Sequence, residues 1–229
     1  MIPDAPVIGV TAESAEQATV YARVIERCGG APRVLLPEIQ RAEPGTGEPI
    51  GGLLVCGRQY ADSPERQCGT RQMQGTVESP IIMAALDNDL PVLCIGQGMH
   101  TLNLAMGGGL VEDISGHAVV KQDGEAVSSY HRIFISPGSK LAAVVGSGGF
   151  VRVNSRHGQG VRHAQKSSML MASAYSAEDG VIEALESTRH RWVIAVQFHP
   201  ERRTELPPHF YRLFEVLVQR GRERTASSP

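Results

Sequence analysis

The sequence predicts an α/β fold, a doubly wound and mostly parallel sheet with antiparallel strands added in the C-terminal half. In the first half, short apolar runs rich in β-branched residues alternate with amphipathic segments, as buried parallel strands and their crossover helices do. The second half holds short strands separated by turn signals, which is typical of antiparallel pairing. The 229 residues contain no linker or internal repeat, so we expect a single domain over residues 1–229.

The elements of the first half follow from hydrophobic spacing and from Gly and Pro at the breaks. Strands are expected at 7–10, 34–37, 53–56 and 91–95, and helices at 15–28, 78–88 and 99–106. Residues 57–75 are polar and aperiodic, which indicates a long surface loop after the third strand. Loops of that length inside a compact domain are often functional.

The elements of the second half are shorter. Strands are expected at 131–136, 151–154, 170–174, 181–185 and 192–198, with Pro137-Gly138 and Asp179-Gly180 among the turns. A last amphipathic helix is expected at 209–220, because Phe210, Leu213 and Leu217 recur on one face. Residues 221–229 are expected to be a flexible tail.

Charge and composition argue against several classes of function. The formal net charge is −2, from 22 basic and 24 acidic residues, and no basic cluster suggests nucleic acid or an anionic membrane as a partner. No apolar run approaches the roughly 20 residues that span a bilayer, and no export signal precedes the first strand, so a cytoplasmic protein is expected. The four cysteines lack CxxC spacing, so neither a disulfide nor a zinc site is indicated, and no cofactor is implied.

The junction between the strand at 91–95 and the next helix has the pattern of a nucleophile elbow. Cys94-Ile95-Gly96-Gln97-Gly98 reads as small-x-X-x-small, a tight turn whose central residue projects above the sheet. The following helix points its N-terminus at the same place, which favours negative charge there. By itself the pattern also fits an ordinary glycine-rich turn.

A second candidate lies at the end of the last strand. His199-Pro200-Glu201 can hold an imidazole at the edge of the sheet and orient it with a carboxylate, as the basic half of a Cys-His-Glu or Ser-His-Asp triad does. Alone, this tripeptide is more often a turn than a catalytic pair.

Several motifs in order produce a family resemblance over nearly the whole chain. They are the elbow with Asn103 and Gly107-Gly108 after it, Asn154-Ser-Arg-His-Gly-Gln159, Asp179-Gly-Val-Ile-Glu183-Ala184 and Val196-Gln-Phe-His-Pro-Glu201. The chain resembles the γ-glutamyl-γ-aminobutyrate hydrolases, the peptidase C26 group of the class I glutamine amidotransferase-like proteins. The resemblance implies a flavodoxin-like fold and hydrolysis of a γ-glutamyl amide by a cysteine nucleophile.

The resemblance also implies roles for individual residues. His199 matches the general base and Glu201 the carboxylate that orients it, while His157 and Gln159 match a motif on the substrate side. Members of the family read G-I-C-R-G-M at the elbow, so the nucleophile position here is Gly96, which has no side chain, and the Arg after it is Gln97.

A second departure lies after the third strand. Family members carry a run of glycines there that contributes to the oxyanion hole, whereas this chain reads Cys56-Gly57-Arg58-Gln59. Gly57, Arg58 and Gln97 are nevertheless expected beside the substrate, and Arg58 offers a cation to an anionic ligand.

Three classes of function stay open. The first is a pseudoenzyme, or a protein with altered chemistry, that binds a small γ-glutamyl-like or carboxylate-bearing molecule. The second is an active hydrolase that uses a displaced thiol, Cys94 or Cys56, although both are more simply small buried residues. The third is an interaction subunit that docks on a partner protein, and a homo-oligomer is also left open. His117, His131 and His157 are interpreted as surface or hydrogen-bonded histidines rather than ligands. A metal site built from histidines near the pocket stays open as an alternative, but no ligand spacing supports one, so none is expected.

Overall fold

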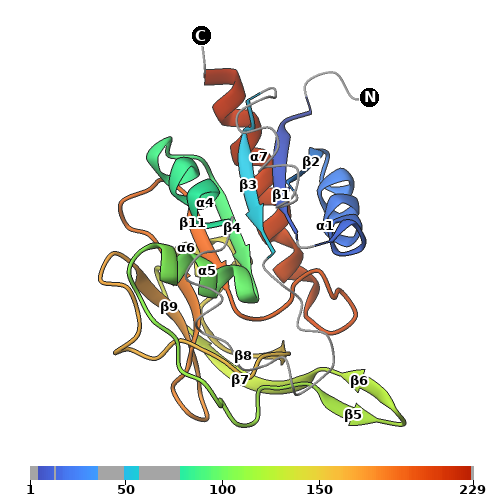
Figure 1. Cartoon of the computed structure of the whole chain (residues 1–229), viewed down its shortest axis with the longest axis vertical. Helices are drawn as coiled ribbons and strands as arrows, with labels where there is room; N and C mark the ends of the chain where they lie inside the picture. Colours follow the sequence, from blue (N-terminus) through green and yellow to red (C-terminus); the bar gives the residue numbers. More distant parts are fainter. Residues whose placement is uncertain (1–4, 13, 36–48, 57–77, 228–229) are drawn as a thin grey trace.

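The computed structural model describes residues 5–12, 14–35, 49–56 and 78–227, and it forms a three-layer α/β arrangement (Figure 1). Its main sheet has nine strands in the order β2-β1-β3-β4-β11-β10-β9-β7-β8. The strands of this sheet are β1 (Val7–Thr11), β2 (Ala31–Leu35), β3 (Gly52–Val55), β4 (Val92–Ile95), β7 (Ser129–Ile135), β8 (Gly149–Ser155), β9 (Met171–Ser176), β10 (Ile182–Glu186) and β11 (Val193–Val196). A separate hairpin pairs β5 (Val120–Gln122) with β6 (Glu125–Val127).

The sheet has a parallel half and an antiparallel half, which confirms the predicted fold class. Strands β2, β1, β3, β4 and β11 run parallel to one another. Strands β10, β9, β7 and β8 pair antiparallel with their neighbours. Strand β11 joins the halves, because it lies parallel to β4 on one side and antiparallel to β10 on the other.

Helices cover both faces of the sheet. On one face α1 (Ala15–Arg27), α6 (Lys140–Val145), the 3₁₀ helix η2 (Pro208–Tyr211) and α7 (Arg212–Ser227) contribute to one core cluster. On the other face α4 (Glu78–Asp87) and α5 (Gln97–Ala105) pack in a second cluster. In Figure 1, α4 and α5 lie on one side of β3 and β4 and α1 lies on the other, with the β5–β6 hairpin far from the C-terminal end of α7. No helix in these described ranges is long and apolar enough to cross a membrane.

The structure corrects several expected boundaries. Helix α5 begins at Gln97, two residues before the expected start, and neither α6 nor the β5–β6 hairpin was predicted. Helix α7 continues to Ser227, so most of the segment expected to be a flexible tail is helical. The expected loop at 57–75, with Gly57 and Arg58, lies outside the described residues.

The sheet brings the two candidate motifs together. Strands β4 and β11 are parallel neighbours, with Ile95 aligned to Val196. The backbone N–H of Gly96 donates a hydrogen bond to the carbonyl of Val196, 2.9 Å away. The elbow and His199 therefore follow adjacent strands at the carboxyl edge of the parallel half, where open α/β sheets usually place their sites.

Candidate active site at the strand β4–helix α5 junction

The turn after β4 has the backbone of a nucleophile elbow. Gly96 is the N-cap residue of α5 and has φ 56° and ψ −117°, a conformation that L-residues rarely adopt. Two residues on, a Cβ at Gly98 would lie 2.1 Å from the carbonyl oxygen of Val55 on β3, so only glycine fits there. This contact explains why the last position of the small-x-X-x-small pattern, Gly98, is small: the first turn of α5 passes directly against β3.

The apex of this turn faces the imidazole of His199. A Cβ built on Gly96 would lie 2.9 Å from Cε1 and 3.2 Å from Nε2 of that ring. Real Cβ contacts are almost never this short, so a larger residue at position 96 would require the ring to move. Whatever side chain stood at position 96 would therefore point at Nε2, the nitrogen that a general base uses.

The other ring nitrogen of His199 is held by a buried carboxylate. Nδ1 lies 2.8 Å from Oε1 of Glu201, and the same oxygen accepts a hydrogen bond of 3.0 Å from the hydroxyl of Tyr21 on α1. Burial alone would raise the pKa of Glu201, but the charge of His199 and these hydrogen bonds lower it. Burial and the charge of Glu201 raise the pKa of Tyr21 well above its usual value, so the phenol stays a neutral donor.

The backbone of His199 is fixed by Asn154, which lies in the buried C-terminal part of β8. Its Oδ1 accepts a hydrogen bond of 2.8 Å from the N–H of His199, and its Nδ2 donates to the carbonyl of His199 at 3.2 Å. The same Nδ2 donates to Glu205 at 2.8 Å. Asn154 is fully buried, so this link across 45 residues positions the imidazole in relation to the elbow.

The substrate-side residues expected from the sequence are buried rather than open to solvent. The side chains of Gln97, His157 and Gln159 belong to residues that are 8%, 7% and 3% exposed. Nδ1 of His157 lies 2.7 Å from the carbonyl oxygen of Gln159, which fixes the local conformation of this segment.

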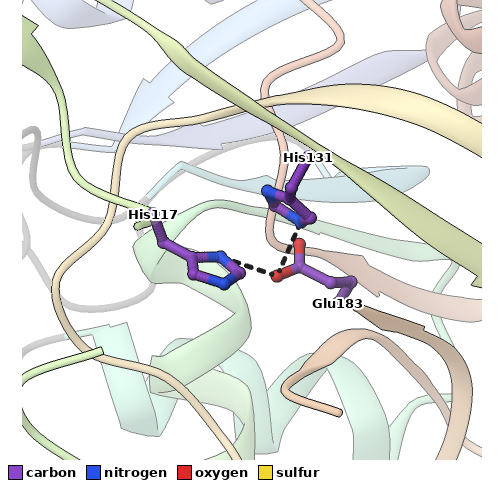
Figure 2. A group of neighbouring side chains, drawn as sticks. All are labelled: His117, His131 and Glu183. Atoms are coloured by element: carbon purple, nitrogen blue, oxygen red, sulfur yellow. Dashed lines mark ion pairs between the residues drawn. The ribbon is translucent and has the colours of Figure 1, made fainter. Parts of the chain in front are cut away.

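Next to this segment lies a cluster that the sequence did not predict. His117, His131 and His157 are all buried, and their rings surround the carboxylate of Glu183 on β10. Figure 2 shows His117 and His131 approaching this carboxylate from different sides. His157 and Glu183 lie in two of the motifs that produce the family resemblance. The four residues of the cluster come from four separate segments, however, and no sequence spacing indicates that they meet. His117, His131 and Glu183 form the one group with the arrangement of metal ligands in the described part of the chain.

The two candidate thiols lie inside the protein. Cys94 is 0% exposed within the core cluster beneath α4 and α5, and Cys56 is 3% exposed within the cluster on the opposite face of the sheet. Neither sulfur is at the apex of the elbow, which is the position of Gly96.

Comparisons with known proteins show which proteins this chain resembles. A Schizosaccharomyces pombe protein that carries the name of a glutamine amidotransferase is 28% identical over 230 residues, covering 96% of this chain and 88% of its own length. The γ-glutamyl-γ-aminobutyrate hydrolase PuuD of Escherichia coli is 28% identical over 151 residues, covering 62% of this chain and 57% of its own length.

Solved structures show the same fold at low sequence identity. A glutamine amidotransferase from Thermotoga maritima superposes with a TM-score of 0.62 at 12% identity, covering 97% of this chain and 99% of that chain. The glutaminase domain of a CTP synthase from Trypanosoma brucei, solved with acivicin, gives 0.65 at 16% identity and covers 93% and 94%. The family model for peptidase C26 matches residues 6–201, from the first strand to Glu201. The chain therefore belongs to the peptidase C26 family of glutamine amidotransferase-like proteins.

Proposed function

We propose that this chain is a peptidase C26 protein without thiol-dependent hydrolysis, and that its elbow binds a small molecule that carries a carboxylate. The observation that carries the proposal is the position of Gly96. A Cβ there would face Nε2 of His199 at 3.2 Å, which is where a nucleophile belongs, and glycine supplies no side chain. In a related type of triad, removal of the nucleophile lowers kcat by on the order of 10⁶.

The other residues of the site keep their hydrogen bonds to one another, which supports a binding function over a vestigial site. His199, Glu201 and Tyr21 form a complete chain of hydrogen bonds, and Asn154 holds the backbone of the histidine. The N-terminus of α5, a helix of nine residues, begins at the same turn. The first turn of a helix favours negative charge, so a carboxylate is the expected ligand group.

A displaced thiol is not favoured. Cys94 is packed among the apolar residues under α5, and Cys56 lies in the core on the other face of the sheet. A nucleophile must come within hydrogen-bond reach of its base, roughly 3 Å, and a buried core position does not offer the substrate access.

The test of lost hydrolysis uses the wild type and Gly96→Cys, with His199→Ala added to the latter as a control. The wild type should give no turnover of glutamine or γ-glutamyl-γ-aminobutyrate above the rate without protein. The new thiol of Gly96→Cys should react rapidly with iodoacetamide, because an adjacent imidazole favours the thiolate, and the added His199→Ala should slow that reaction. Wild-type turnover at roughly 1 s⁻¹ or above would refute the proposal.

The test of binding uses a panel of small carboxylates and γ-glutamyl compounds, followed by the thermal shift of the wild type and of Gly96→Leu. A ligand of the elbow should raise the melting temperature of the wild type by mass action. The leucine side chain should fill the space beside His199 and abolish the shift, with circular dichroism confirming the fold. Equal shifts in both proteins, or none in the wild type, would show that the elbow is not a binding site.

A further inference from the structure

A buried carboxylate lies at the centre of three imidazoles, apart from the pair His199–Glu201. Oε1 of Glu183 is 3.4 Å from Nδ1 of His117, 3.2 Å from Nε2 of His131 and 3.5 Å from Nε2 of His157. The side chain of Glu183 is 0% exposed and none of the three imidazoles exceeds 7%. Four ligand-type side chains, brought from four segments, thus lie around one small volume, and Figure 2 shows three of them, His117, His131 and Glu183.

Nδ1 of His117 and Nε2 of His157 lie within hydrogen-bond distance of each other, at 3.2 Å, but the carboxylate and the ring of His131 are less well matched. Within the described residues, neither oxygen of Glu183 and neither ring nitrogen of His131 has a hydrogen-bond partner of acceptable geometry. The separations of 3.2–3.5 Å exceed the ~2.7–2.9 Å typical of a bond between an imidazolium and a carboxylate. Buried polar atoms are rarely left in this state, and an ion between them would satisfy all of them at once.

The spacing of the atoms is that of ligands around a metal. With bonds of 2.0–2.1 Å, two ligands of a tetrahedral zinc ion lie roughly 3.3 Å apart. Besides the three distances to Glu183, Nδ1 of His117 lies 3.2 Å from Nε2 of His157. The ligand atoms of His117, His131 and Glu183 all lie within 4.8 Å of one another.

The outer contacts orient two of the imidazoles so that a bare nitrogen faces the cluster. A carbonyl only accepts, so Nδ1 of His157 must donate to the oxygen of Gln159, which leaves the lone pair of the neutral ring on Nε2. Nε2 of His117 lies 3.4 Å from the carboxylate of Asp179, which leaves Nδ1 facing Glu183. Histidine ligands of metals are commonly held by such carboxylate and carbonyl partners.

The cluster lies one side chain away from solvent. The side chain of Asp179 is 30% exposed, and its carboxylate lies 3.4 Å from Nε2 of the buried His117.

We propose that His117, His131 and Glu183 bind one divalent first-row transition-metal ion, with His157 beside them as a further nitrogen donor. Two or three imidazoles and one carboxylate form a donor set that suits Zn²⁺ and its neighbours rather than Mg²⁺ or Ca²⁺. The proposal is independent of the elbow, because it uses neither Gly96 nor the pair His199–Glu201.

The first experiment uses the full chain without an affinity tag, stripped of metal with a chelator. Titration with Zn²⁺ by calorimetry should give one ion per chain, and Co²⁺ should give the strong visible absorption of a four-coordinate site, which Zn²⁺ then displaces. A wild type that binds no Zn²⁺ at micromolar concentration, or that gives only the weak absorption of aqueous Co²⁺, would overturn the proposal.

The second experiment identifies the ligands. Glu183→Gln and His131→Gln keep the approximate shape of the side chains and should weaken Zn²⁺ binding by about a hundredfold or more, since loss of even an outer partner costs roughly 10–100-fold. His163→Ala, a change at an exposed histidine, is the matched control and should bind as the wild type does. If both core variants melt cooperatively and bind Zn²⁺ normally, the cluster is an ion-paired network rather than a metal site.

Discussion

At the scale of single residues, the site depends on one glycine and one histidine ring. Gly96 permits the left-handed turn at φ 56°, and its missing side chain lets the ring of His199 come within 2.9 Å of where a Cβ would stand. The ring is held in this place by Glu201 through Nδ1 and by Asn154 through its backbone. The imidazole and its hydrogen-bond partners are therefore held in place although the apex has no side chain.

Cys94 provides a prediction at this scale. Its side chain is 0% exposed and lies among the apolar residues under α5, so reagent can reach it only when the core opens. Iodoacetamide should leave Cys94 of the native protein unmodified over a period that suffices for complete reaction in guanidinium, as measured by peptide mass spectrometry. Fast native labelling of Cys94, accompanied by loss of a hydrolytic activity, would instead identify it as a displaced nucleophile.

The role of a single residue could be predicted from the sequence only where that residue belongs to a recognisable motif. The pairing of His199 with Glu201 follows from their spacing after a strand, and the geometry agrees with it. Tyr21 was not predicted, because a tyrosine on the buried face of an amphipathic helix gives no sign of its partner 180 residues away. His117 and His131 are buried rather than on the surface, and nothing in their sequence spacing indicates that the folded sheet brings both rings to Glu183.

At the scale of elements, β3 and β4 were predictable because they are buried on both faces and read as continuous apolar runs. Strand β2 was expected at 34–37 but runs from Ala31 to Leu35, and its residues are only half-buried. Helix α6 has only six residues, too few to show a helical period. Strands β5 and β6 have three residues each, and their alternation is equally short. The turn between them, Asp123-Gly124, has positive φ at both residues. Asp-Gly is a common pair in two-residue hairpin turns, but without longer strands beside it this pair did not lead to a predicted hairpin.

The contact between α5 and β3 provides a prediction for these elements. In Gly98→Ala the new Cβ would lie 2.1 Å from the backbone carbonyl of Val55, and neither the helix nor the strand can yield cheaply. We expect the free energy of unfolding to fall by roughly 3 kcal/mol or more, because overpacking against backbone forces the elements apart. Denaturant titration would measure it.

Gly109→Ala is the matched control for that change. A Cβ at Gly109 would meet only the side chain of Gln165, at 3.7 Å, which is an ordinary contact. Its effect should stay within about 0.5 kcal/mol of the wild type. Equal stability of the two variants would mean that α5 does not pass against β3 as described.

At the scale of the whole molecule, the end of the chain differs from the sequence prediction. Residues 221–229 are expected to be a flexible tail, but Gly221 lies inside α7, which continues to Ser227. A Cβ there would lie 2.9 Å from Ile8, and a Cβ at Gly51 would lie 2.8 Å from the carbonyl of Gly221. The glycine thus allows the helix to approach the sheet closely, a role that the sequence alone does not distinguish from a helix stop.

The stability of the whole molecule should fall in mild acid because of His100 on α5. Burial, with the charge of His157 acting in the same direction, lowers the pKa of His100 from 6.5 to about 4, against weaker opposing effects of Gln197 and Glu183. Between these two pH values the unfolded chain binds a proton at His100 that the folded chain does not. The free energy of unfolding should therefore decrease as the pH falls from 6.5 towards 4.

One proton corresponds to about 1.4 kcal/mol per pH unit, so this histidine contributes on the order of 3 kcal/mol over the interval. The variant His100→Gln cannot bind that proton. Its free energy of unfolding should therefore change with pH less steeply than that of the wild type, by the equivalent of up to one proton, whatever its stability at neutral pH. Urea titrations from pH 4 to 7, in the presence of a chelator so that no metal ion alters the neighbouring imidazoles, would measure the slope. His163→Ala, at an exposed site, should follow the wild type, and parallel curves for His100→Gln and the wild type would show that His100 titrates equally in both states.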